Sequence, residues 1–236
     1  MRDIFFETLK YEAEKLNIEL NKPQLEKFFN YADFLLEYNK KINLTSIISY
    51  HDIIIKHFID SILPNKILNK KEKTIDVGSG AGFPGIPLKI VNPGISLTAL
   101  DSSGKKIKFL NELSQKINIK LETVCDRAEE IAKTDLRESF EVCVSRAVAP
   151  LNVLCELCLP LVKIGGIFIA FKGPNAKYEI LNSKRALEVL GGEIFCIENF
   201  NLSKNLGQRV IIKIKKTKNT PKNYPRLYAK ILSERL

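Results

Sequence analysis

Cysteine is scarce in this sequence and irregularly placed. The 236 residues include five cysteines, an odd number without regular spacing, which is a poor basis for a disulfide framework. Cys155 and Cys158 form a CxxC pair, but the pair lies in the apolar, helix-like segment LNVLCELCLPL, with no second cysteine pair or histidine pair nearby. Because a zinc site needs four ligands and a redox pair an exposed helix start, we expect buried thiols and no metal.

Long apolar runs are also absent. No stretch approaches the roughly 18 to 20 apolar residues that cross a bilayer. Acidic residues interrupt the first segment, MRDIFFETLKYEAEKL, where a signal peptide would have a continuous apolar core. We therefore expect a cytoplasmic protein without membrane contact, of a length that suits one well-buried domain with an extension.

Acidic residues become rare toward the C-terminus. The net charge is +10, and residues 1–60 carry eight Lys or Arg against ten Asp or Glu, so residues 61–236 carry +12. The stretch 213–236 holds eight basic residues against the single Glu234. This distribution suits a polyanion, and nucleic acid is the commonest in cytoplasm. A merely solvated basic tail explains the charge equally well.

The first quarter of the chain has a helical pattern. Apolar side chains recur at three-to-four spacing from Phe5 to Leu16 and again from Leu25 to Leu36, the second run following Pro23 in a first turn. A third helix is expected over 52–63. We therefore predict an N-terminal helical extension over residues 1–63.

From residue 74 onward, short apolar strands alternate with helices. The expected strands are 74–77, 96–100, 119–124, 140–145 and 166–171, and the expected helices are 85–91, 104–117, 127–133, 150–161 and 176–190. Helical crossovers imply parallel pairing and a doubly wound α/β sheet.

The chain ends differently. EIFCIENFNL (193–202) and QRVIIKIKK (208–216) are joined by the short link SKNLG without a helix, which predicts an antiparallel β-hairpin at the sheet edge. Over residues 64–236 this order resembles the class I S-adenosylmethionine-dependent methyltransferase domain, forming one compact unit with the extension. Other doubly wound enzymes append edge strands too.

The segment DVGSGAGFPG after the first strand fits two templates. Read from Gly80 it is the GxGxxG of a nicotinamide-binding loop, and read from Asp76 and Gly78 it is the DxGxGxG of a methyltransferase loop. Both place backbone amides and a helix N-terminus against the ligand. Asp76 favours the second template, because a carboxylate would repel pyrophosphate but attract the ammonium group of S-adenosylmethionine. Phe83 would then form an apolar wall.

Acidic residues also mark the next two strand ends. Asp101 ends the second strand, where a carboxylate accepts hydrogen bonds from ribose hydroxyls in either cofactor class. The third strand ends in VCDRAEEI, whose turn can accept a hydrogen bond from an adenine amine, although Asp126 and Glu129 can equally form a helix capping box. Both features predict an adenosine-bearing ligand without choosing between the cofactors.

The end of the fourth strand, VSRAVAPL, lacks two motifs. It has neither the cysteine nucleophile of a cytosine C5 enzyme nor the Asn/Asp-Pro-Pro-aromatic motif of an adenine N6 enzyme. Arg146 stands there instead. Guanine N7 has a free lone pair, so positioning beside a methyl donor can suffice, and an arginine fork matches guanine O6 and N7. Arg146 is thus the candidate for positioning donor or guanine, with a surface ion pair as the structural alternative.

Together these segments resemble the bacterial small-subunit rRNA 7-methylguanosine methyltransferases, the RsmG (GidB) family. The matching segments are NLTSI, HFIDSI, DVGSGAGFPGIPLKI, LDSSGKKIKFL, RAEE, SRAVAPL, FKGP and YPR. The resemblance implies a class I fold, S-adenosylmethionine as methyl donor and methylation of a guanine N7 in 16S rRNA. It places cofactor contacts on Gly78, Phe83, Ala128, Glu129 and Arg146. On physical grounds we add Gly80 and Asp101.

Basic side chains are candidates for RNA phosphate contacts, with plain solvation as the alternative. They are Lys105, Lys106, Lys172 and Arg226. The partner would be 16S rRNA or the small ribosomal subunit, bound by a monomer. His57, with Asp60 and Ser61, is expected to link the extension to the sheet rather than act as a base. The segment LYAKILSERL (227–236) is helix-like and departs from the family's glycine- and proline-bearing end.

Two other functions compete with methyl transfer. A nicotinamide-dependent oxidoreductase would use the GxGxxG template, but His51 and His57 both precede the sheet and no other acid–base residue is evident at the strand ends. A non-catalytic ribosome-binding protein could keep the fold without the chemistry, but it would have no reason to keep the glycine loop and Asp101.

Overall fold

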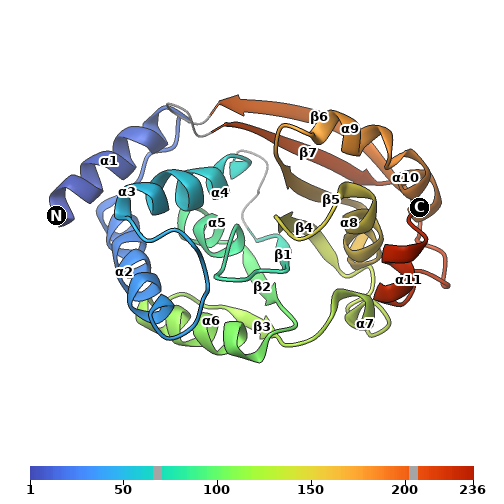
Figure 1. Ribbon diagram of the computed structural model, residues 1–236, viewed down its shortest axis with the longest axis horizontal. Helices are drawn as coiled ribbons and strands as arrows, with labels where there is room; N and C mark the ends of the chain where they lie inside the picture. The colour runs from blue at the N-terminus through green and yellow to red at the C-terminus, as the bar shows by residue number, and fades with distance from the viewer. Residues whose placement is uncertain (66–70, 202–206) are drawn as a thin grey trace.

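A seven-stranded sheet forms the centre of the molecule (Figure 1). The structure is a computed structural model that describes residues 1–65, 71–201 and 207–236. The strand order is β3-β2-β1-β4-β5-β7-β6. The strands are β1 (Lys73–Val77), β2 (Ser96–Leu100), β3 (Glu122–Val124), β4 (Phe140–Arg146), β5 (Val162–Lys172), β6 (Gly192–Asn201) and β7 (Gln208–Lys216).

Pairing within the sheet is parallel from β1 to β5, and β7 runs antiparallel to both β5 and β6. This confirms the predicted doubly wound sheet with its terminal hairpin. Of the expected hairpin link at 203–207, only Gly207 lies within the described residues.

Helices cover both faces of the sheet (Figure 1). Along β4 the side chains alternate, so that Val142 and Val144 face one core and Cys143 the other. The first core includes side chains of α1 (Arg2–Glu14), α2 (Lys22–Asn39), the π-helix η1 (Ile53–Ile59), α5 (Gly85–Val91) and α6 (Gly104–Lys116). The second includes side chains of α7 (Ala128–Ile131), α8 (Leu151–Cys158), the 3₁₀ helix η3 (Leu159–Leu161), α10 (Lys184–Leu190) and α11 (Tyr228–Ser233).

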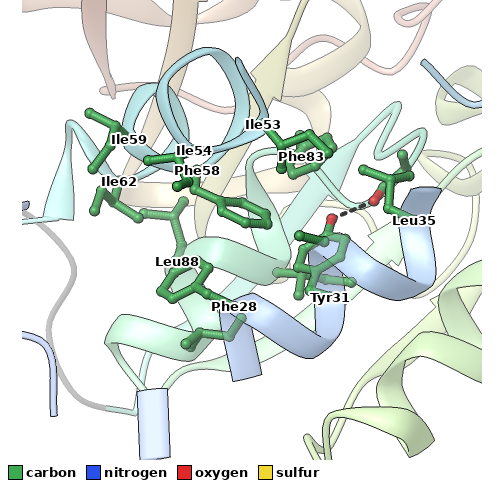
Figure 2. Packing of buried hydrophobic residues seen from close by; sticks show 14 of the residues in the cluster. Phe28, Tyr31, Leu35, Ile53, Ile54, Phe58, Ile59, Ile62, Phe83 and Leu88 are labelled. Carbon is green, nitrogen blue, oxygen red and sulfur yellow. Dashed lines mark hydrogen bonds between the residues drawn. The ribbon is translucent and has the colours of Figure 1, made fainter. Parts of the chain in front are cut away.

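The N-terminal extension shares the first core with the sheet. Its second helix starts with a capping box, in which the side chains of Asn21 and Gln24 each accept a hydrogen bond from the other residue's backbone N–H. Phe28 of α2 lies 4.9 Å from Phe58 of η1 between ring centroids, and Figure 2 shows both packed beside Leu88 of α5. The extension therefore buries its apolar face against the methyltransferase-like part, while a boundary at residue 63 stays a prediction.

Several elements differ from the expected ranges. The helix expected over 52–63 is divided into α3 (Tyr50–Asp52), η1 and α4 (Asp60–Ile62). Three consecutive isoleucines of η1, Ile53 to Ile55, are buried, which one stripe of a regular amphipathic α-helix would not allow. The helix expected over 176–190 is interrupted between α9 (Ala176–Leu181) and α10, where the Ser183 hydroxyl donates to the backbone carbonyl of Glu179.

The other ranges shift by a few residues. The third strand and the following helix are shorter than expected. The helix-like segment 227–236 forms α11, as predicted.

The cysteines are free thiols. Cys155 and Cys158 are buried on α8, as expected for this CxxC pair, and burial raises the pKa of both thiols. Cys143 is also buried, whereas Cys196 is half-buried and Cys125 is exposed. Among the described residues, no helix is long and apolar enough to cross a membrane. In the same residues no three His, Cys, Asp or Glu side chains group as ligands for a metal ion.

Candidate active site

A cavity of about 480 Å³ opens at the carboxyl ends of β1, β2 and β4. It lies where the strand order reverses, at the position where doubly wound sheets bind ligands. All seven residues predicted to bind the cofactor line it: Gly78, Gly80, Phe83, Asp101, Ala128, Glu129 and Arg146. The fold thus brings together side chains that are up to 68 residues apart (146 − 78) in the sequence.

The glycine loop presents bare backbone to this cavity. Gly78 has φ +74°, and a Cβ atom there would come within 2.4 Å of the Val148 side chain. Gly80 has φ +58°, and the nearest atom to a Cβ built there is the Gly78 carbonyl oxygen at 3.9 Å. Since left-handed backbone and close approach both favour glycine, these two positions fit a loop over which a ligand passes closely.

Asp76 lies beneath the loop rather than at the cavity surface, contrary to the contact expected with a cofactor ammonium group. It is 1% exposed, and its Oδ2 accepts a 2.9 Å hydrogen bond from the backbone N–H of Gly85, the first residue of α5. Burial raises the pKa of this carboxyl group to about 7. Within the described residues its Oδ1 has no hydrogen-bond partner.

This arrangement separates the two glycine templates. In a nicotinamide-binding loop the first amides of the helix face the pyrophosphate. Here a protein carboxylate already occupies the N–H of Gly85. The loop therefore suits a cofactor without pyrophosphate, such as S-adenosylmethionine.

Asp101 holds the loop from the end of β2. Its Oδ2 accepts a 3.0 Å hydrogen bond from the Gly80 N–H and lies 3.3 Å from the Lys106 ammonium, while its Oδ1 accepts from the Ser103 N–H at 2.9 Å. The carboxylate lines the cavity at the place expected to receive ribose hydroxyls.

At the end of β3, the buried Glu129 lies beside Ala128 in the cavity wall. Its carboxylate lies 3.8 Å from the guanidinium of Arg127.

Phe83 is held in a stack of rings. It is 6% exposed, and its ring lies 4.3 Å from His57 and 5.3 Å from Tyr31, nearly parallel to both. The Tyr31 hydroxyl donates a 2.5 Å hydrogen bond to the Ala81 carbonyl of the glycine loop. Burial raises the pKa of Tyr31 well above its ordinary value, so the phenol stays a neutral donor. The N-terminal extension thereby supports the cofactor loop directly.

Arg146 belongs to a cluster around a buried carboxylate that we call the Asp60 cluster: the buried Asp60 and the half-buried Arg146, Arg209 and His57. The Asp60 carboxylate accepts from Nη1 of Arg146 at 2.7 Å and from Nε of Arg209 at 3.0 Å. Nη2 of Arg146 lies 3.3 Å from Nδ1 of His57, whose Nε2 lies 2.9 Å from the Thr45 hydroxyl. The cluster joins the extension to β4 and β7, so the predicted linking role of His57 is confirmed.

His57 is neutral in this setting. Burial, and then the nearby Arg146 guanidinium, lower its pKa from the ordinary 6.5 to about 3. A neutral ring can accept from Arg146 at Nδ1 and donate to Thr45 at Nε2, which matches both contacts. The Arg146 guanidinium also lies 5.0 Å from the Phe83 ring centroid, so the cluster and the ring stack form one structure.

A second cavity, of about 640 Å³, adjoins the first. The two share His57, Arg146, Ala147 and Val148 as lining residues. The second cavity is also lined by basic side chains of Lys56, Lys172 and Arg209. Arg146 therefore lies between a cavity with the features of a cofactor site and a second cavity that is lined by basic side chains and by the carboxylates of Asp60 and Glu179.

Two of the expected RNA contacts already have charged partners within the protein. Arg226 is only 15% exposed, and its guanidinium donates to both carboxylate oxygens of the buried Glu156, Nε at 2.8 Å and Nη2 at 2.7 Å, so its charge is paired within the protein. Lys172 is buried, donates to the Ala149 carbonyl at 2.6 Å and pairs with Glu179 at 2.7 Å, which commits its charge within the protein. Lys105 is exposed and Lys106 is half-exposed beside Asp101, and for both a phosphate contact stays a prediction.

Three residues at the site escaped the sequence prediction. Tyr31 supports the loop, Arg209 completes the Asp60 cluster, and Tyr228 of α11 lines the first cavity. Arg209 is 149 residues from Asp60 in the chain, and neither it nor Tyr228 stands at the end of a parallel strand. No local pattern marks such residues.

Comparison with known proteins decides between the remaining possibilities. The family model GidB, described as rRNA small subunit methyltransferase G, matches residues 24–209. This chain belongs to the GidB family. Among GidB relatives named ribosomal RNA small subunit methyltransferase G, that of Acetivibrio thermocellus is 50% identical over 217 residues, covering 91% of this chain and 89% of its own. That of Alkaliphilus oremlandii is 47% identical over 222 residues, covering 92% of this chain and 93% of its own.

Solved structures agree on the fold. TYW2 of M. jannaschii, solved in complex with AdoMet, has a TM-score of 0.53 at 16% identity, covering 66% of this chain and 76% of its own. A ribosomal protein L11 methylase of Lactobacillus delbrueckii subsp. bulgaricus has a TM-score of 0.52 at 18% identity, covering 69% of this chain and 79% of its own. The fold is thus the class I methyltransferase fold, and the cofactor of this GidB protein is S-adenosylmethionine. The nicotinamide-dependent alternative is set aside.

Proposed function

We propose that this protein transfers the methyl group of S-adenosylmethionine to the N7 atom of a guanine in 16S rRNA. It acts in the cytoplasm as a monomer, on free rRNA or on the small ribosomal subunit. The proposal extends the family assignment to a target atom, a compartment and an assembly state.

The observation that carries the proposal is the meeting of two cavities at Arg146. The first has glycine backbone, Asp101 and the turn after β3 on its walls, which suits an adenosine-bearing cofactor. S-adenosylmethionine supplies an electrophilic methyl group carried on a sulfonium. The second cavity opens beside the first at the end of β4 and would hold the acceptor base next to that group.

The second cavity suits an acceptor that needs no deprotonation. Each acidic or histidine side chain that lines it is already bonded: Asp60 to two arginines, Glu179 to Lys172, and His57 to Thr45 and Arg146. The lowered pKa of His57 also makes it a poor proton acceptor at neutral pH. Guanine N7 carries an unprotonated lone pair, so positioning is sufficient for attack.

Arg146 would position the reactants rather than exchange protons with them. Its guanidinium also donates to the backbone carbonyl of Lys56 at 3.2 Å, and so is held rigidly between the two cavities. An arginine fork can bind guanine O6 or stay near the cofactor carboxylate. The fixed positive charges of Arg146 and Arg209 also suit the negative charge of RNA.

The test uses 16S rRNA and small subunits from cells lacking the methyl mark, with methyl-labelled S-adenosylmethionine and the purified full chain. Mass spectrometry of the nucleosides should show label in 7-methylguanosine. Label in another nucleoside would contradict the N7 target. Binding of S-adenosylhomocysteine and rRNA without any transfer would favour the non-catalytic ribosome-binding alternative.

A matched pair of variants assigns the two cavities. Asp101 lines only the first cavity and Arg209 only the second. Asp101→Ala should raise the Kd for S-adenosylhomocysteine by about tenfold or more, because charged hydrogen bonds are lost. Arg209→Gln should lower methyl transfer through the KM for rRNA while leaving that Kd unchanged. Equal effects of both variants on cofactor binding would contradict the division into donor and acceptor cavities.

A further inference from the structure

The C-terminal segment, residues 217–236, reaches the first cavity. Tyr228 of α11 lines it together with Arg127, Ala128 and Glu129 of the turn after β3. The Tyr228 ring is half-buried against the second core, and the Arg127 guanidinium lies 5.3 Å from its centroid. Figure 1 shows α11 beside α7 and α8, far along the chain from the glycine loop.

The position of Tyr228 identifies the end of the cavity that it closes. The glycine loop lies at the end of β1, Asp101 at the end of β2 and Arg127 just after β3. A cofactor laid across these strand ends, with its ribose at Asp101, has its adenine near the turn after β3. Adenine offers a flat π face, which aromatic side chains bind by stacking.

Buried polar contacts hold this segment in place. Glu156 of α8, 1% exposed, accepts from the Arg226 backbone N–H at 2.9 Å as well as from the guanidinium fork. Arg137 donates to the backbone carbonyls of Thr220 at 2.7 Å and Tyr224 at 2.8 Å. These contacts end two residues before Tyr228, and so determine where its ring lies.

We propose that Tyr228 forms a wall of the cofactor site against the adenosine half of S-adenosylmethionine, and that the Arg226–Glu156 pair positions it. The inference rests on the proposed function, since it assumes this cofactor in the first cavity. It gives the helical segment at the end of the chain a role in cofactor binding rather than in gripping RNA.

Isothermal titration calorimetry of the full chain tests the wall. The ligands are S-adenosylhomocysteine and 5′-methylthioadenosine, which keeps the adenosine half and lacks the amino acid. Tyr228→Ala should raise the Kd for both ligands by roughly 5- to 150-fold, the range for loss of an aromatic stack on a base. Tyr228→Phe should stay within about twofold, because the ring is kept. Tyr178→Ala, at a tyrosine of α9 that is 70% exposed, serves as the matched control and should change neither Kd.

The outcomes separate this inference from the proposed function. If the unsubstituted chain binds S-adenosylhomocysteine and a folded Tyr228→Ala binds it equally well, the wall is overturned and the methyltransferase stands. Weaker binding of S-adenosylhomocysteine with unchanged binding of methylthioadenosine would overturn the placement at the adenosine half. If the unsubstituted chain binds neither ligand, both proposals fail.

Arg226→Lys tests the positioning pair. The lysine keeps a positive charge beside Glu156 but cannot bind both carboxylate oxygens. The segment should therefore stay attached to α8 while the Tyr228 ring shifts within the cavity. The KM for S-adenosylmethionine should rise by about tenfold, while kcat and the KM for rRNA stay within about twofold. A variant with lowered thermal stability but an unchanged KM would reduce Arg226 to a structural role and overturn this part of the proposal.

Discussion

The two ends of the chain both reach the cofactor cavity, but they are attached to the sheet by different forces. The N-terminal extension buries a series of aromatic and aliphatic side chains in the first core, among them Phe28, Tyr31 and Phe58 (Figure 2). The C-terminal segment 217–236, described in full, buries far fewer apolar side chains, among them Pro225 and Ile231. Its contacts with the sheet domain include partial packing of Tyr224, Tyr228 and Leu236 against the second core. Its backbone and polar groups also form hydrogen bonds with Arg137, Glu156 and Lys216.

The two kinds of attachment should contribute differently to the stability of the fold and to the position of side chains at the cavity. Burial of a large apolar side chain contributes about 1.5 to 3 kcal/mol each, so the extension stabilises the whole fold. A buried ion pair contributes little net stability, because desolvation offsets the attraction, but it specifies geometry. The extension therefore supports the glycine loop by packing, and the C-terminal segment places Tyr228 by directed bonds. At the N-terminal attachment the Asp60 cluster adds directed bonds to this packing, because it lies where the packed core meets the site.

Asp60→Asn should have the largest effect. The substitution removes the carboxylate shared by Arg146 and Arg209, so that both half-buried guanidinium groups lose a charged contact. Breaking a buried pair from one side costs about 3 to 5 kcal/mol. Chemical denaturation should show this loss, and methyl transfer should fall as well because Arg146 loses its position.

The control for Asp60→Asn is Asp52→Asn, which removes a half-exposed carboxylate of the neighbouring helix paired with Lys56. It should leave the free energy of unfolding nearly unchanged, because solvent screens an exposed ion pair. Equal losses from both substitutions would show that burial does not distinguish the two pairs.

Arg226→Lys should have an intermediate effect on stability. The lysine keeps one charged contact with Glu156 but cannot form the fork. Loss of one charged hydrogen bond costs about 1.5 to 3 kcal/mol. Denaturant midpoints measure this value, and a loss as large as that of Asp60→Asn would mean that the C-terminal attachment carries as much of the fold's stability as the N-terminal one.

His57 should make the N-terminal attachment sensitive to acid. Its pKa is about 3 in the folded protein against an ordinary value of 6.5, so the unfolded chain binds the proton first as pH falls. Stability is therefore lost as pH falls from about 7 toward 3, and linkage gives about 2 kcal/mol between pH 7 and pH 5. His57→Gln should remove this part of the slope, since glutamine does not titrate. Asp76 is present in both the unsubstituted protein and His57→Gln, and its raised pKa changes stability with pH in the opposite direction. Comparing the free energies of unfolding of the two proteins at pH 7 and pH 5 therefore isolates the contribution of His57. The same pH dependence of stability in both proteins would contradict the prediction.

The sequence predicted much of the fold and of the first cavity because both follow local rules. Three-to-four apolar spacing marked α1 and α2, and short apolar runs marked the strands. Parallel strands place their ends at one edge, which is why the seven cofactor residues converge. The partners of Asp60 and Glu156 could not be predicted in this way. Arg209 and Arg226 are 149 and 70 residues from them, and only tertiary packing chooses such partners. Lys172 and Arg226 looked like solvent-facing cations for the same reason.

The smallest effects should come from exposed ion pairs at the two ends. Lys10 and Glu14 on α1, and Lys230 on α11 with Glu234 at its C-cap, form i,i+4 contacts at 3.9 Å, with all four side chains more than half exposed. Solvent screening and side-chain entropy leave such pairs nearly neutral, so Lys10→Ala and Lys230→Ala should each change the free energy of unfolding by less than about 0.5 kcal/mol. Thermal unfolding of both variants measures this directly. A clear loss of stability in Lys230→Ala but not in Lys10→Ala would mean that surface charge, and not only the buried Arg226–Glu156 pair, holds α11 against the cavity. Lys10 is the suitable comparison because its helix, α1, is already fixed by apolar burial.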